Sequence, residues 1–123
     1  MITENIELAV NSAYFIEIQF FGTDSKLIDF SGRSAVFRTG DYVLANIPLE
    51  SGVEFSDVNS IITLSNDGTF KMTLSSLFVN KVLGNITSNN DDFTVHFGEG
   101  NFSESSPFYV NEQLVWKGKI KEV

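Results

Sequence analysis

The stretch Gly22–Arg38, which reads GTDSKLIDFSGRSAVFR, decides how the rest of the chain is interpreted. It follows an alternating apolar segment, Tyr14–Phe21, and it begins with a polar turn. Leu27–Gly32 then leads into a second alternating segment. Because strand side chains alternate between two faces, this pattern predicts two strands joined at the sequence IDFSG. The residues expected to form this structural turn are Asp29, Ser31 and Gly32.

Alternation with a period of two continues through most of the chain. The other segments that show it are Ile6–Val10, Ala35–Arg38, Asp92–Gly98 and Gln113–Val123, and Tyr42–Asn46 is a possible short strand. The clearest hairpin is Ile61–Leu74, in which two apolar segments flank the turn Ser65–Gly68. A final hairpin is expected around Asn111 and Glu112, between residues 108–110 and 113–123.

Only Ser76–Gly84 is typical of a helix, and we expect one or two turns there. Serine can cap the amino end, and Gly84 can adopt the left-handed conformation common just after the carboxyl end. About seven or eight short strands with regular turn signals predict an all-β protein. We expect residues 1–123 to form a single immunoglobulin-like antiparallel β-sandwich, with twelve phenylalanines supplying large inward side chains.

Composition limits the classes of function. The chain has no cysteine, so neither a disulfide framework nor a thiolate zinc site is expected. A net charge of −8 argues against a nucleic-acid partner. The first residues, MITENIELAV, lack the basic start of a signal peptide, and no apolar run is long enough to span a membrane. The expectation is a soluble protein made in the cytoplasm, with no membrane partner.

Residues for catalysis are sparse. His96 is the only histidine, and its place in an alternating strand is typical of a surface residue. The chain lacks the G-x-S-x-G sequence of a nucleophile elbow and the D-x-[DN]-x-[DN]-G calcium loop. Its nine glycines are scattered rather than gathered in a phosphate-binding loop. We therefore predict no catalytic, cofactor-binding or metal-binding residues, no cofactor, and a protein that is not an enzyme.

The C-terminal segment carries the candidate interaction residues. Lys117, Lys119 and Lys121 share one strand face, opposite Trp116 and Ile120. One interpretation is that these lysines protect an exposed sheet edge from stray pairing. The other is that they contact the acidic body of a neighbouring copy, since Lys71 and Lys81 are the only basic residues between Thr39 and Trp116. Such a head-to-tail contact would close into a ring.

Several of these sequences together resemble a known family. They are Asp29-Phe30-Ser31-Gly32, Ala35–Arg38, the strands around Ser65–Gly68, and the closing Trp116–Ile120. They are similar to the small immunoglobulin-like β-sandwich proteins of tailed-bacteriophage tails and baseplates, such as the upper baseplate protein N-terminal domain family. One departure is Phe93–His96, where that family usually has a tyrosine and an aspartate.

The resemblance implies a non-enzymatic structural protein of the virion, in a phage tail baseplate, tail-tip or collar ring. It implies partners among other phage tail proteins and copies of the chain itself, hence a homo-oligomer. The alternative function is a carbohydrate- or receptor-binding module, with Phe102, Tyr42 and Tyr109 as exposed aromatic rings. These rings could instead cover the ends of the core. A small enzyme is a third hypothesis.

Overall fold

The computed structural model describes residues 1–21, 30, 33–40, 42–46, 59–87, 89–99 and 110–123. These residues form eight strands and one helix. In chain order they are β1 (Ile6–Leu8), β2 (Tyr14–Gln19), β3 (Arg33–Thr39), β4 (Tyr42–Ala45), β5 (Ile61–Leu64), β6 (Thr69–Leu74), α1 (Ser76–Asn85), β7 (Asp92–Glu99) and β8 (Val110–Glu122).

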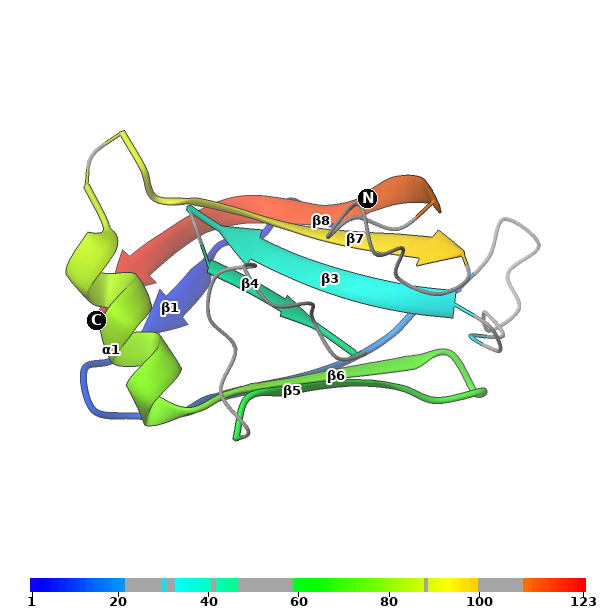
Figure 1. Cartoon of the computed structure of the whole chain (residues 1–123), viewed down its shortest axis with the longest axis horizontal. Coiled ribbons are helices and arrows are strands. Elements are labelled where there is room, and N and C mark those ends of the chain that lie inside the picture. The colour runs from blue at the N-terminus through cyan, green and yellow to red at the C-terminus, as the bar shows by residue number, and fades with distance from the viewer. Residues whose placement is uncertain (22–29, 31–32, 41, 47–58, 88, 100–109) are drawn as a thin grey trace.

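The strands make two sheets that pack face to face, with α1 at one end (Figure 1). The larger sheet has the order β1-β8-β7-β3-β4, and the smaller sheet has the order β2-β6-β5. This division is the immunoglobulin-like one, because the second, fifth and sixth strands form one sheet and the third, seventh and eighth strands lie in the other. The predicted all-β sandwich is confirmed.

Two expectations about strand pairing are wrong. β1 pairs with β8 in parallel, with Ile6 opposite Ile120, so the sandwich is not wholly antiparallel. The expected final hairpin is also absent, because β8 continues as one strand through Asn111 and Glu112. The pairing of β7 with β8 shifts between Phe97 and Glu99, and this β-bulge absorbs a residue where the sequence suggested a turn.

The predicted hairpin at residues 61–74 is confirmed. β5 and β6 are antiparallel, and the turn between them contains Gly68 at a φ of +80°. The Gly68 N–H donates to the Ser65 carbonyl at 3.1 Å, and the Ser65 N–H donates to the Thr69 carbonyl at 2.9 Å. A glycine suits this position because a positive φ is costly for a residue with a Cβ.

The helix begins as predicted but continues further. The Ser75 hydroxyl accepts a hydrogen bond from the Phe78 N–H at 3.1 Å, so it caps the amino end. Gly84 lies inside the helix rather than after it, and the helix ends at Asn85. The Asn85 side chain donates to the Lys81 carbonyl at 2.9 Å, and the Ile86 N–H donates to the Leu83 carbonyl. These bonds satisfy last-turn carbonyls without a left-handed glycine.

Phenylalanine rings join the two sheets. Phe20, next to β2, lies edge-to-face with Phe97 of β7, their centroids 5.0 Å apart. Within the larger sheet, Phe93 of β7 lies edge-to-face with Trp116 of β8 at 5.1 Å. Phe78 of α1 is fully buried and covers the end of this core. Because the chain has no cysteine, aromatic packing takes the place that an inter-sheet disulfide occupies in antibody domains.

The N-terminal segment is bound along the outer edge of β8. The Ile2 N–H donates to the Val115 carbonyl at 2.9 Å, and the Lys117 N–H donates back to the Ile2 carbonyl at 3.0 Å. The indole N–H of Trp116 donates to the Glu4 carbonyl at 2.8 Å. Because these bonds cover one side of β8 and β7 pairs with its other side, β8 is an interior strand of the larger sheet. Its lysines therefore have a neighbouring segment on each side.

Candidate functional site

The predicted split between the two faces of β8 is confirmed. Trp116 and Ile120 are each 2% exposed, whereas Lys117, Lys119 and Lys121 are all exposed on the other face. The edge-protection interpretation is wrong, because β8 has β1 on one side and β7 on the other. The lysines therefore lie on a sheet face rather than on a sheet edge.

Carboxylates lie beside two of the three lysines. The Lys119 ammonium is 3.0 Å from a carboxylate oxygen of Asp91 and 3.0 Å from one of Asp92. The hydrogen bond from Lys119 lowers the pKa of the Asp91 carboxyl, and the bonds to both carboxylates raise the pKa of Lys119. Lys121 is paired in register with Glu7 of β1. The lysine face is therefore a mixed-charge surface rather than a positive stripe.

A second surface is the outer face of the smaller sheet. Phe15 of β2 is 60% exposed, and Ile61 of β5 is 52% exposed. Both lie in register with Thr73 of β6, so they form one row across the sheet. Two residues further along β2, the next row on this face contains Glu17 opposite Lys71 of β6. We call Phe15, Ile61, Glu17 and Lys71 the outer-sheet surface.

Sequence reasoning missed the outer-sheet surface, although a signal was present. Phe15 lies on the same face of β2 as Glu17 and Gln19, which is the polar face of that strand. A large aromatic side chain on a polar face is the informative exception to the ordinary pattern. Its partner in the row, Ile61, could not be assigned to the same surface without the strand order.

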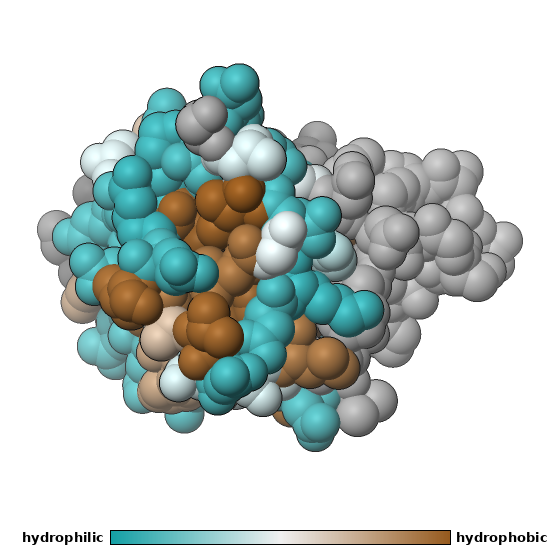
Figure 2. Space-filling model, turned by 90° about the vertical axis from the view of Figure 1, so that its left-hand side faces the viewer, coloured by the Kyte–Doolittle hydropathy of each residue, from teal (hydrophilic) through white to brown (hydrophobic). Residues whose placement is uncertain are grey.

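A third feature is the end of the molecule that carries α1. Figure 2 looks onto this end and shows apolar side chains gathered within a polar surround. Leu77 of α1 is 54% exposed, and Val10 and Val123 are also exposed. Paired hydrogen bonds between Asn11 and Asn80 fasten the segment after β1 to the helix at this end.

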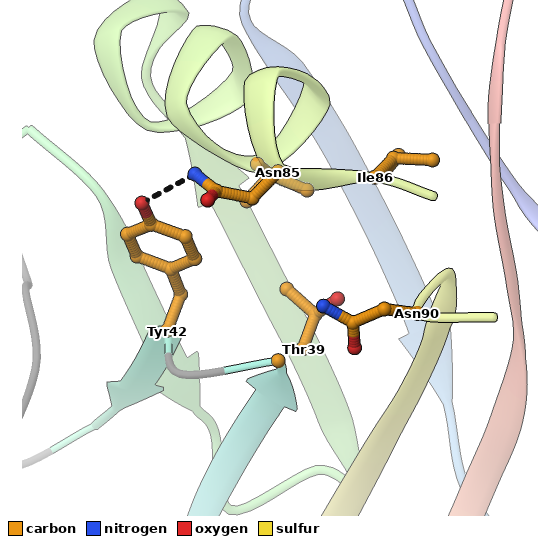
Figure 3. A pocket seen from close by; sticks show the side chains of 7 residues that line it. Thr39, Tyr42, Asn85, Ile86 and Asn90 are labelled. Carbon is orange, nitrogen blue, oxygen red and sulfur yellow. Dashed lines mark hydrogen bonds between the residues drawn. The ribbon is translucent and has the colours of Figure 1, made fainter. Parts of the chain in front are cut away.

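A small pocket lies between the carboxyl end of α1, the turn from β3 to β4, and the segment before β7. In Figure 3 the Tyr42 ring and the Asn85 side chain point toward each other, and the Asn90 carboxamide lies beside Thr39. The Asn85 Nδ2 group donates to the Tyr42 hydroxyl at 2.7 Å. Tyr42 packs edge-to-face on Phe78 at 6.1 Å, so its ring covers the end of the core, as the simpler interpretation proposed.

The remaining residues singled out from the sequence lie either outside the described residues or in β7. Phe102, Tyr109, Asp29, Ser31 and Gly32 lie outside the described residues. His96 is half-buried in β7, with its Nδ1 atom 3.2 Å from the Arg38 guanidinium. Among the described residues, no group of three or more His, Asp or Glu side chains could hold a metal ion. Within the same part of the chain, no helix combines the length and apolar character needed to cross a membrane.

No protein-family model matches the chain. No curated protein matches it either.

Proposed function

We propose that this protein is a non-enzymatic structural module that acts through protein–protein assembly. Following the resemblance of its sequence, we place it in the virion, as a baseplate, tail-tip or collar component of a phage tail. The single observation that best supports assembly is the outer-sheet surface, where Phe15 and Ile61 expose large apolar side chains. Singly scattered apolar residues are common on protein surfaces, whereas apolar residues gathered on one face mark interaction sites. Phe15 and Ile61 share one face of the smaller sheet, with Thr73 between them.

The proposed occupant of this surface is a second copy of the chain. Neighbouring strands lie about 4.8 Å apart, so Phe15 and Ile61 stand about 10 Å apart with Thr73 between them. Glu17 and Lys71 lie side by side in the adjacent row. A two-fold axis between facing copies would bring Glu17 of each copy near Lys71 of the other, which makes the surface self-complementary in charge.

The expected strength follows from the exposed fractions. Burying a whole Phe or Ile side chain contributes about 1.5–3 kcal/mol. Phe15 is 60% exposed and Ile61 is 52% exposed, so each has roughly half of this contribution, about 1 kcal/mol, still to gain. Two copies contribute four such side chains. Their removal should therefore weaken dimerisation by about 4 kcal/mol, which is roughly a thousandfold in Kd.

The test is native mass spectrometry and light scattering over a range of protein concentrations. We expect dimers or larger even-numbered assemblies of the wild-type chain, and monomers of the double variant Phe15→Ser/Ile61→Thr. Leu77→Ser is the matched control, because Leu77 is 54% exposed but lies on α1. A wild-type chain that stays monomeric up to about 1 mM, the concentration at which contacts worth roughly 4 kcal/mol form, would refute the proposal. An equal effect of Leu77→Ser would move the interface to the helix end.

The proposed contact between copies does not use the lysine face of β8 or the helix end. We therefore assign these two surfaces to contacts with other tail proteins. The structure offers one adjustment to the lysine hypothesis. Lys119 is already bound by Asp91 and Asp92, and Lys121 faces Glu7, so Lys117 is the lysine whose in-register neighbour, Thr94, is neutral. A contact with the acidic body of a neighbouring copy should therefore depend most on Lys117.

Carbohydrate binding is the second candidate function. The observation that favours it is the pocket beside Tyr42, whose described lining contains hydroxyl and carboxamide groups from three separate segments.

A further inference from the structure

The pocket of Figure 3 is built from neutral hydrogen-bonding groups at or beside the ends of four elements. Tyr42 begins β4, Asn85 ends α1, Thr39 ends β3, and Asn90 precedes β7. Gly40 shapes one wall. Its φ is +56°, and a Cβ added there would lie 3.4 Å from the Asn90 carboxamide nitrogen. The pocket is therefore open at this wall because residue 40 has no side chain.

The hydrogen bonds already made leave a definite set of groups for a ligand. Both Asn85 Nδ2 hydrogens are used, one toward the Tyr42 hydroxyl at 2.7 Å and one toward the Lys81 carbonyl at 2.9 Å. The Asn85 carboxamide oxygen is then the group that can accept from a ligand. The Tyr42 hydroxyl accepts from Asn85, so its own hydrogen is available to donate.

Asn90 adds both hydrogen-bond donors and a hydrogen-bond acceptor to the pocket. Its backbone N–H donates to the Thr87 carbonyl at 3.2 Å, and its exposed side chain presents a carboxamide to the pocket. A carboxamide offers two N–H donors and an acceptor oxygen whichever way it is turned. The Thr39 hydroxyl donates to the Asp92 carbonyl at 3.0 Å, so toward the pocket it can only accept. The pocket thus combines donors and acceptors.

The charge of the pocket favours a neutral ligand. None of the described residues that line it is charged, and α1 has no basic residue in its last turn. The carboxyl end of a helix carries a partial negative charge, which repels anions. A carboxylate or phosphate would therefore enter the pocket without a cation to pair with it. Among neutral groups, those with an N–H donor suit the helix end best.

The volume of the pocket and its apolar lining further limit which chemical group it can bind. The pocket has a volume of about 100 Å³, which is too small for a whole sugar ring but large enough for a group of a few heavy atoms. Val82 and Ile86 contribute apolar atoms to the lining. The required ligand group is therefore small, neutral and amphipathic, with one N–H, one acceptor oxygen and one methyl.

We propose that this pocket binds the acetamido group of an N-acetylated amino sugar. The acetamido N–H donates to the Asn85 carboxamide oxygen. The acetamido oxygen accepts from both the Asn90 carboxamide and the Tyr42 hydroxyl, and the methyl lies against Val82 and Ile86. The sugar ring stays outside the pocket, where its hydroxyls meet polar surface that includes the exposed Thr87. This polar surround distinguishes a sugar from an acetylated lysine side chain, whose four methylene groups need an apolar channel.

The experiment is a titration followed by ¹⁵N–¹H correlation spectra of the labelled chain. The probes are N-acetylglucosamine, glucosamine, glucose and Nε-acetyl-lysine. We expect N-acetylglucosamine to saturate in the millimolar range and to shift the side-chain amide signals of Asn85 and Asn90. Glucosamine and glucose lack the acetamido group and should bind at least tenfold more weakly, since each lost hydrogen bond changes affinity by about that factor.

Two variants test the assigned groups. Asn90→Ala removes the exposed carboxamide, and Tyr42→Phe removes the hydroxyl while keeping the ring on Phe78. Each should raise the Kd for N-acetylglucosamine about tenfold while the spectrum stays that of a folded protein. Asn89→Ala is the control, because Asn89 is an exposed neighbour that does not line the pocket. Its Kd should be unchanged.

Three results would overturn the proposal. They are equal affinity for glucose and N-acetylglucosamine, tighter binding of Nε-acetyl-lysine than of the sugar, and an unchanged Kd for Asn90→Ala. The outcome is separate from that of the assembly proposal, because the monomeric variant Phe15→Ser/Ile61→Thr keeps the pocket intact. Binding to that variant with wild-type Kd would show that the pocket acts within one copy.

Discussion

Replacing Gly118 with alanine would test how the N-terminal segment is held on β8. A Cβ at Gly118 would overlap the Glu4 carbonyl oxygen and would lie 2.9 Å from the Glu4 carbonyl carbon. It would also lie 3.0 Å from the ring of Phe93, which is 1% exposed. Because the first obstacle is backbone and the second is a packed core ring, the N-terminal segment must move away.

The cost can be worked from the bonds that this movement breaks. The Trp116 indole N–H donates to the Glu4 carbonyl at 2.8 Å, and the Lys119 N–H donates to the Asn5 side chain at 2.9 Å. Each bond contributes about 1 kcal/mol, and a buried indole N–H left without a partner adds about 1–3 kcal/mol. The gain from a less flexible unfolded chain is about 0.4–1 kcal/mol. The net loss in the free energy of unfolding is therefore about 3 kcal/mol.

Urea denaturation followed by the fluorescence of Trp116, the only tryptophan, measures this loss directly. A loss of this size should lower the melting temperature by about 10 °C in a domain of this length. Gly84→Ala is the matched control, because no atom lies within 4 Å of an added Cβ and the residue is inside α1. The control should gain about 1 kcal/mol from helix propensity. An unchanged midpoint for Gly118→Ala would refute the reasoning.

Three further predictions concern the helix cap and the charged face. Ser75→Ala should lower the free energy of unfolding by about 1 kcal/mol, because the Phe78 N–H loses its acceptor; thermal melts compare it with wild type, and an equal Tm contradicts the cap. Lys119→Glu should lower the urea midpoint at low salt, because it brings a third carboxylate beside Asp91 and Asp92, whereas Lys117→Glu should leave the midpoint unchanged; equal midpoints for the two would contradict the pairing. The pKa of Asp91 is lowered in the folded state by its bond to Lys119, so its stabilisation is present above the unfolded pKa of about 3.9 and is lost as pH falls through the lower, folded value. Asp91→Asn should therefore show less loss of stability than wild type in acid melts between about pH 5 and pH 2, and parallel curves would contradict this assignment.

Local patterns in the sequence were sufficient for the strands and their faces. The alternation of β2 placed Tyr14 and Ile16 toward the core, and the turn at Gly68 identified the β5–β6 hairpin. The same period of two correctly separated Trp116 and Ile120 from the lysines of β8. These predictions succeeded because each depends on residues within a few positions of one another, whose side-chain directions follow from the backbone geometry of a strand.

Local patterns failed where distant segments meet. Asn111 and Glu112 resemble a turn, but pairing with β7 keeps them in a continuous strand. β1 lies parallel to β8, and Glu4 bonds to Trp116 across 112 positions of sequence. Pairing with β1 makes β8 an interior strand rather than a sheet edge. It therefore excludes the interpretation that the lysines of β8 protect an exposed edge.

The candidate sites depend on the same long-range contacts. The outer-sheet surface joins Phe15 to Ile61 through β6, and the pocket joins Tyr42, Asn85 and Asn90 from three separate segments. The sequence by itself determined the class of fold and the inward or outward direction of most strand side chains. Only the tertiary structure decided which outward side chains become neighbours, because strand order and register are selected by core packing over the whole chain rather than by any one segment.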